Sequence, residues 1–172
     1  HSLYLLQPEK LKDETFISEL KSKQANFQIV VAFRMLPEVV WSMPEYGTFN
    51  LHASLLPQYR GAAPINHVII NGEKETGLTT FFLDREIDTG AIIKQLKIPI
   101  GDEENAEQLH NRMMIAGAGL VIETVDAIIN QNVSPLSQSI FEKQGDLIKT
   151  APKISKEDCR IDWNKTAVQV VN

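Results

Sequence analysis

The chain has 172 residues, a net charge of −5 and a hydrophobic content of 43%, which together predict one ordinary soluble domain. The negative charge argues against an autonomous nucleic-acid-binding module, because such modules usually carry a basic face. The sequence has no run of roughly 20 apolar residues that would span a membrane, and its N-terminus does not resemble a signal peptide. Its single cysteine, Cys159, cannot form an internal disulfide, so we expect a cytoplasmic protein.

Strands and helices alternate along the chain, and the clearest of them carry local signals. Residues 27–33 form a continuous apolar, β-branched run, which is typical of a buried strand. Asn105 and Gln108 can form a capping box in front of a long apolar stripe. In chain order, we expect a helix over 12–24, a strand over 27–33, a short helix opening at 36–37, a strand over 48–52, a helix from Pro64 to Gly72, strands over 76–83 and 91–98 joined by the loop 84–90, and a helix over 106–130.

This alternation predicts the α/β class, with a mostly parallel sheet and helices on both of its faces. In such sheets, functional sites lie at the carboxyl ends of strands. The rule directs attention to the end of the strand over 48–52 and to the loop over 84–90.

Asn50 and His52 stand two residues apart in an expected strand, so both side chains should project from the same face. An amide can donate a hydrogen bond to a developing oxyanion, and an imidazole can move a proton near neutral pH. Each residue alone also fits a structural role: a turn for Asn50, a half-buried hydrogen bond for His52, and a turn for Asp88 in the following loop. His67 and His110 lie on expected helices, and we interpret both as structural.

The combination of motifs is more specific than any single residue. The segment FNLHASLLPQYRGAAPIN over 49–66 is followed by ETGLTT over 75–80 and by Asp88-Thr89-Gly90. This pattern resembles the formyltransferases that use 10-formyltetrahydrofolate, and the resemblance runs from about Leu6 to the end of the chain. It implies a Rossmann-like catalytic domain with 10-formyltetrahydrofolate as co-substrate.

The resemblance implies catalytic roles for Asn50, His52 and Asp88. It implies that the folate side is lined by Ser54, Leu55, Leu56 and Pro57. The four histidines and the single cysteine show no metal-ligand spacing, so we expect no bound metal. RGAAPI over 60–65, VAFRMLP over 31–37 and KISKEDCRIDW over 153–163 are most similar to the branch that formylates the methionine of initiator Met-tRNA for translation initiation. A monomer, with that tRNA and the formyl donor as partners, is expected.

The same resemblance divides the chain into two parts. Residues 1–150 are expected to form the formyltransferase catalytic domain without its N-terminal half. Residues 151–172 are expected to be a linker towards a C-terminal tRNA-binding domain that this chain lacks. Arg34 stands where many members of the family have glycine. Arg60 fits either an anion contact or an ion pair at a strand end.

Four alternatives remain open on the residues alone. The first is another formyl-folate enzyme, either a formyltetrahydrofolate hydrolase or a transferase to a sugar nucleotide or glycinamide ribonucleotide. The second is a serine hydrolase built on Ser54, His52 and Asp88, although the G-x-S-x-G elbow is missing. The third is a metal enzyme, against which no ligand-spacing motif is present. The fourth is an inactive fragment that only binds.

Overall fold

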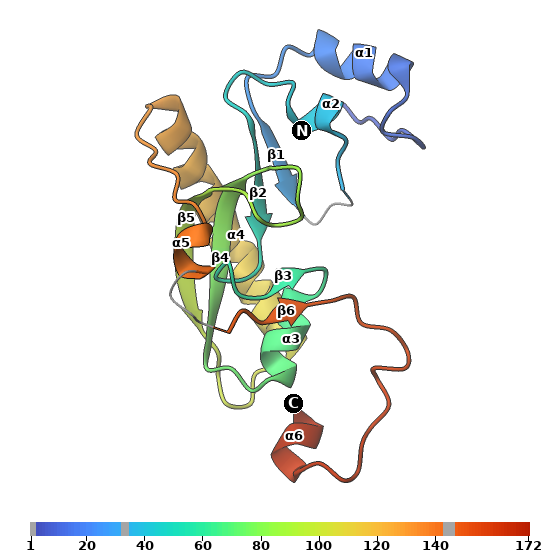
Figure 1. Cartoon of the computed structure of the whole chain (residues 1–172), viewed down its shortest axis with the longest axis vertical. Coiled ribbons are helices and arrows are strands. Elements are labelled where there is room, and N and C mark those ends of the chain that lie inside the picture. Colours follow the sequence, from blue (N-terminus) through green and yellow to red (C-terminus); the bar gives the residue numbers. More distant parts are fainter. Residues whose placement is uncertain (1–2, 32–34, 143–146) are drawn as a thin grey trace.

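A four-stranded sheet forms the centre of the structure (Figure 1). The computed structural model describes residues 3–31, 35–142 and 147–172. The strands lie in the order β1 (Gln28–Val31), β2 (Thr48–His52), β4 (Glu75–Phe82) and β5 (Ile92–Pro99). All four occur where the sequence predicted strands. The last part of the first expected strand and Arg34 lie outside the described residues.

The described sheet is mixed in direction. β1 pairs parallel to β2, whereas β2 with β4 and β4 with β5 pair antiparallel. The α/β class is therefore confirmed, but the prediction of a mostly parallel sheet is wrong for the described strands. For β4 and β5 the cause is the short connection over 83–91, because a parallel return needs a crossover of a dozen or more residues, whereas a shorter loop makes a hairpin. β2 and β4 are joined by the longer connection over 53–74 and are nevertheless antiparallel.

The long helix α4 (Ala106–Ile129) covers one face of this sheet. Its capping box forms as predicted, with Asn105 and Gln108 bonding to each other's backbone N–H groups. At Gly117, an added Cβ would lie 2.9 Å from the Leu51 side chain, so helix and strand approach closely. The buried residues of α4 recur at helical spacing: Leu109, Met113, Gly117, Leu120, Thr124 and Ile128.

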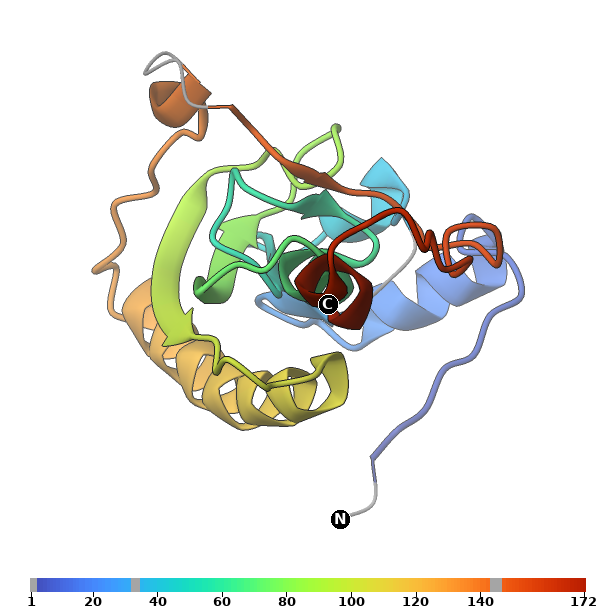
Figure 2. The same cartoon turned by 90° about the horizontal axis from the view of Figure 1, so that it is seen from below.

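The opposite face is covered by the segment 53–63 and by the short helix α5 (Ser139–Glu142) rather than by a second long helix. The Thr79 hydroxyl accepts from the Leu56 N–H at 3.1 Å and donates to the Ser54 carbonyl at 2.7 Å, which fastens the segment to the sheet. Leu56 packs with Phe81 and Ile92 in a buried hydrophobic cluster. Figure 2 shows α4 and this segment on opposite sides of the sheet.

The remaining elements lie around the ends of the sheet. They are α1 (Glu14–Ser22), α2 (Glu38–Trp41), β3 (Arg60–Gly61), α3 (Pro64–Ile70), β6 (Thr150–Ala151) and α6 (Ala167–Val171). β6 pairs with β3, and beyond it the chain makes a wide loop that ends at α6 (Figure 1). Within the described ranges, no helix is long and apolar enough to cross a lipid bilayer.

Candidate active site

Asn50 and His52 project from the face of β2 that lies away from α4. Their strand partners across β4 are Phe81 and Thr79, respectively. His52 is 7% exposed, and its ring meets the Phe81 ring edge-on at a centroid distance of 6.4 Å. Asn50 is only half-buried, and its side chain has no hydrogen bond within the described part of the chain. Its amide is thus available to a ligand beside the imidazole.

The two ring nitrogens of His52 face two different acceptors. Nε2 lies 3.0 Å from the Tyr59 carbonyl oxygen, and because a carbonyl can only accept, Nε2 carries a hydrogen. Nδ1 lies 3.7 Å from Oδ2 of Asp88. This separation is longer than a direct hydrogen bond but short enough for an ion pair or for a bridging group. The structure therefore brings the predicted carboxylate to the predicted imidazole.

Asp88 sits in the loop between β4 and β5 with a φ of 56°, the left-handed conformation that aspartate tolerates better than most residues. Its Oδ2 accepts a hydrogen bond from the Gly61 N–H at 3.0 Å. Gly61 itself has a φ of 126° and lies so close to Ala151 that an added Cβ would be 2.4 Å from the Ala151 carbonyl oxygen. The β3–β6 pair thus places the donor that orients the carboxylate.

Gln138, which the sequence did not single out, and Arg60 hydrogen bond to the backbone of this loop. Gln138 donates to the Asp88 carbonyl at 2.9 Å and to the Gly90 carbonyl at 2.8 Å. Arg60 donates to the Asp88 carbonyl at 3.1 Å and to the Gln138 side chain. Arg60 therefore binds protein groups at this loop, whereas the sequence left its role open. No sequence motif marks Gln138, which lies in a polar stretch.

A polar cluster fixes Tyr59, whose carbonyl holds His52. The Tyr59 hydroxyl donates to Glu73 and accepts from Asn71, and Lys149 also donates to Glu73. Burial raises the pKa of Tyr59, and the hydrogen bond to Glu73 acts in the same direction. Burial also raises the pKa of Glu73, but hydrogen bonds from Lys149 and Tyr59 outweigh it and leave that pKa below its usual value. Tyr59 thus stays neutral beside a charged Glu73.

The segment predicted to line the folate is packed more tightly than expected. Ser54 is fully buried and its hydroxyl donates to the Gln58 carbonyl at 2.6 Å. Leu56 is 2% exposed and belongs to the core. Leu55 packs beside Gly77. The buried side chains of Ser54 and Leu56 therefore do not form an open apolar wall. The Leu56 N–H is already bonded to Thr79, and the carbonyls of Ser54 and Leu56 accept from Thr79 and Gln95, so the second lone pairs of these carbonyl oxygens remain for a ligand.

The structure bears on two of the alternatives, the serine hydrolase and the metal enzyme. A buried hydroxyl that already donates to a carbonyl is not poised as a nucleophile, which disfavours the serine hydrolase. Among the residues that the structure describes, no three His, Cys, Asp or Glu side chains gather as metal ligands.

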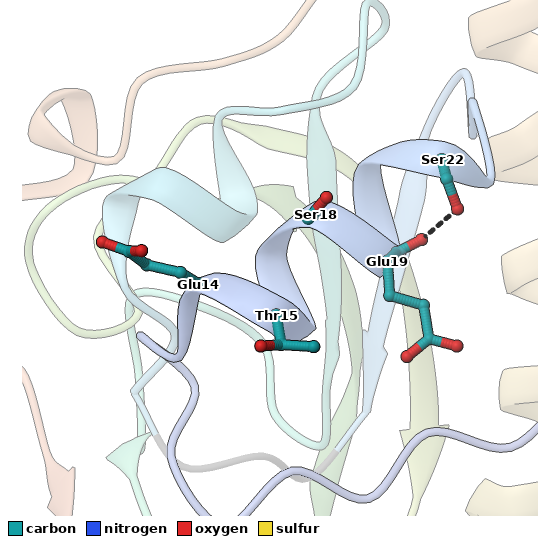
Figure 3. Close-up of a pocket in the computed structure, with 5 residues that line it drawn as sticks. All are labelled: Glu14, Thr15, Ser18, Glu19 and Ser22. Carbon is teal, nitrogen blue, oxygen red and sulfur yellow. Dashed lines mark hydrogen bonds between the residues drawn. The ribbon is translucent and has the colours of Figure 1, made fainter.

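A separate hollow of about 590 Å³ lies along α1, away from the histidine and the loop. Figure 3 shows its lining side chains on one helix, with Glu14 and Glu19 extending in different directions. Ser22 donates to the Glu19 carbonyl at 2.6 Å. The residues that line it all belong to this one helix and include no histidine, lysine or cysteine, and the hollow shares no residue with the site at His52 and Asp88.

The structure thus places an amide and an imidazole at the end of β2, and a carboxylate in the loop between β4 and β5, on a mixed sheet. The sequence profile of the family described as "Formyl transferase" matches residues 1–125, and the chain belongs to this family. It is 62% identical over 169 residues to the methionyl-tRNA formyltransferase of Bacteroides thetaiotaomicron, covering 98% of this chain and 52% of that protein. It is 59% identical over 172 residues to the methionyl-tRNA formyltransferase of Flavobacterium johnsoniae, covering 100% of this chain and 53% of that protein.

Solved structures agree on the fold. A sugar N-formyltransferase from a Shewanella species superimposes with a TM-score of 0.73 at 18% identity, over 94% of this chain and 63% of that one. A sugar 3N-formyltransferase crystallised with dTDP and 5-N-formyl-THF gives 0.68 at 25% identity, over 88% of this chain and 55% of that one. The present chain spans about half the length of the curated relatives it matches.

Proposed function

We propose that this chain forms the catalytic part of an enzyme that transfers the formyl group of 10-formyltetrahydrofolate to the amino group of methionine on initiator Met-tRNA. The high identity to proteins named methionyl-tRNA formyltransferase supports this acceptor. A related structure crystallised with a formyl-folate supports the donor. The exposed, unpaired Cys159 fits the reducing cytoplasm, where this monomeric enzyme would act.

The geometric observation that carries the proposal is the placement of His52 between the Tyr59 carbonyl and the Asp88 carboxylate. Because Nε2 is committed to the carbonyl, Nδ1 is the nitrogen that exchanges a proton with the reactants. Nδ1 and Oδ2 of Asp88 lie 3.7 Å apart, so the reacting amine or a water that approaches from the side would lie within reach of both atoms.

The reaction then proceeds in two steps. The methionine amine attacks the formyl carbon, a C–N bond forms, and the carbonyl oxygen becomes an oxyanion that the Asn50 amide stabilises. The bond between the formyl carbon and N10 breaks, and the proton lost by the amine passes by way of His52 to N10. Asp88 stabilises the imidazolium that forms in between. Loss of an oxyanion donor such as Asn50 costs about 2.7–4 kcal/mol of barrier in other enzymes.

Backbone groups of residues 54–57 would hold the folate beside this site. Since the Ser54 and Leu56 side chains are buried and the Leu56 N–H already donates to Thr79, the carbonyl oxygens of the segment, each with two lone pairs, are the groups that would hydrogen bond to a flat heterocycle. Leu55 and Pro57 complete the predicted contact.

Acceptor competition tests the function. The protein expressed from its complete coding sequence is supplied with labelled 10-formyltetrahydrofolate and either initiator Met-tRNA, a nucleotide-linked amino sugar, or no acceptor. We expect label on Met-tRNA, and loss of about 100- to 1,000-fold in rate for Asn50→Ala. Label on the sugar, or formate released without an acceptor, would replace the proposal with a related formyl-folate reaction. An Asn50→Ala variant at full rate would remove the proposed oxyanion donor.

A further inference from the structure

Gln138 is a buried polar side chain outside the predicted motifs. It lies immediately before α5 and is 2% exposed. A glutamine this deeply buried is retained only when its amide is hydrogen bonded, because an unpaired buried polar group costs about 1–3 kcal/mol. What it bonds to therefore indicates what it is for.

The Gln138 amide uses all of its donors on the hairpin loop. Both Nε2 hydrogens go to backbone carbonyls, at 2.9 Å to Asp88 and 2.8 Å to Gly90. Its Oε1 accepts from Nε of Arg60 at 3.1 Å and from Nη2 of Arg60 at 2.7 Å. This network fixes the orientation of the amide, because a flipped amide would aim its oxygen at two carbonyl oxygens.

These hydrogen bonds hold Asp88 and Gly90, the part of the loop that is not exposed to solvent. Residues 84–87 are exposed, whereas Asp88 is 12% exposed at its side chain and Gly90 is buried. Asp88 adopts a φ of 56°, which surrounding contacts must maintain. Gln138 and Arg60 hold the Asp88 carbonyl by hydrogen bonds, and the carboxylate of Asp88 then faces the Gly61 N–H and His52.

We propose that Gln138 is a positioning residue for formyl transfer: with Arg60, it holds the backbone of Asp88 so that the carboxylate faces His52. The proposal rests on the function proposed above, since it assigns Gln138 to the same reaction. Gln138 acts through Asp88 and does not touch the reactants.

A double-mutant cycle separates positioning from general stability. Gln138→Met preserves the volume of the side chain but removes every hydrogen bond. Because a displacement of about 1 Å can cost roughly 100-fold in rate, we expect kcat to fall by about that factor while KM for the formyl donor is unchanged. In an Asp88→Asn background, Gln138→Met should cost nothing further. Losses that multiply in the double variant would overturn the proposal, as would a change in KM alone.

Two further variants distinguish the loss of positioning from a general loss of stability. Gln138→Glu keeps the Arg60 partner but points oxygen at the two carbonyls, so it should lower kcat at least as much. Thr124→Val removes a buried 2.9 Å hydrogen bond to Thr80 on the opposite face of the sheet. It should lower the unfolding temperature and leave kcat unchanged. A Thr124→Val variant that loses kcat as Gln138→Met does would assign the effect to stability and overturn the proposal.

A crystal structure of the Gln138→Met variant tests the positioning role of Gln138 without a measurement of activity. We expect Oδ2 of Asp88 to leave the Gly61 N–H, which it accepts from at 3.0 Å in the parent structure. An unmoved carboxylate would overturn the positioning role even in an active enzyme. If the parent protein formylates no Met-tRNA while the carboxylate moves as expected, the proposed function fails and the positioning of Asp88 stands.

Discussion

Replacing Gly61 by alanine should disrupt both the fold and the site. The φ of 126° at Gly61 is a conformation that side-chain-bearing residues rarely adopt. The new Cβ would also meet the Ala151 carbonyl oxygen at 2.4 Å, which is backbone and cannot rotate away. Relief requires β3 and β6 to separate, and that movement withdraws the Gly61 N–H from Asp88.

The magnitude follows from these two contributions. Backbone strain of this kind costs about 1–3 kcal/mol, and an overpacked contact adds about 1–3 kcal/mol. The sum of roughly 2–6 kcal/mol, at about 2–4 °C per kcal/mol for a chain of this size, lowers the unfolding temperature by roughly 4–24 °C. Formyl transfer should fall as well, because Asp88 loses the donor that orients it.

Thermal unfolding followed by circular dichroism measures the effect, with Gly119→Ala as the matched control. Gly119 lies inside α4, and an added Cβ would meet nothing within 4 Å. The same chemical change there should stabilise the protein by about 0.5–1 kcal/mol, since alanine is the better helix former. A Gly61→Ala variant that unfolds at the wild-type temperature would refute the steric reasoning.

Two more changes test the surroundings of the site. Gly90→Ala would place a Cβ 1.7 Å from the Phe82 carbonyl oxygen, so the hairpin loop must shift. Both the unfolding temperature and kcat should therefore drop, and unchanged values of both would contradict the packing. Glu104 accepts hydrogen bonds from Arg112, which lower its pKa below the usual 4.5, while burial partly opposes the shift. The stability from this pair is therefore present above pH 4.5 and is lost as the pH falls through the lower pKa of the folded state. Glu104→Gln should flatten the acid side of a plot of unfolding temperature against pH, and an unchanged slope would exclude the pair as a cause.

Local signals predicted most of the elements. The helix expected over 106–130 is α4, because its capping box and apolar stripe depend only on neighbouring residues. The helix expected from Pro64 to Gly72 is α3, with proline in its first turn. Strand direction was misjudged, since apolar runs resemble each other in parallel and antiparallel sheets. The short loop over 83–91 makes β4 and β5 a hairpin, but no local signal gives the direction of β4 relative to β2.

The site was predictable only in part. Alternation along one strand correctly placed Asn50 and His52 on the same face. The strand-end rule directed attention to the loop that holds Asp88, and the family resemblance gave this residue its role. The Tyr59 carbonyl and Gln138 had no signal, because a backbone acceptor has no residue type and Gln138 bonds across 50 residues of sequence. Such contacts depend on the tertiary fold.

The most direct test of the central claim compares His52→Ala with His110→Ala in the enzyme expressed from its complete coding sequence. His110 is exposed on α4, and among the described residues its side chain hydrogen bonds only to its neighbour Asn111. Single-turnover formyl transfer to initiator Met-tRNA is measured for both variants at matched folded fractions. We predict a loss of about 100- to 10,000-fold for His52→Ala and the wild-type rate for His110→Ala. Transfer at the wild-type rate by His52→Ala would contradict the claim that the imidazole between Tyr59 and Asp88 moves the proton.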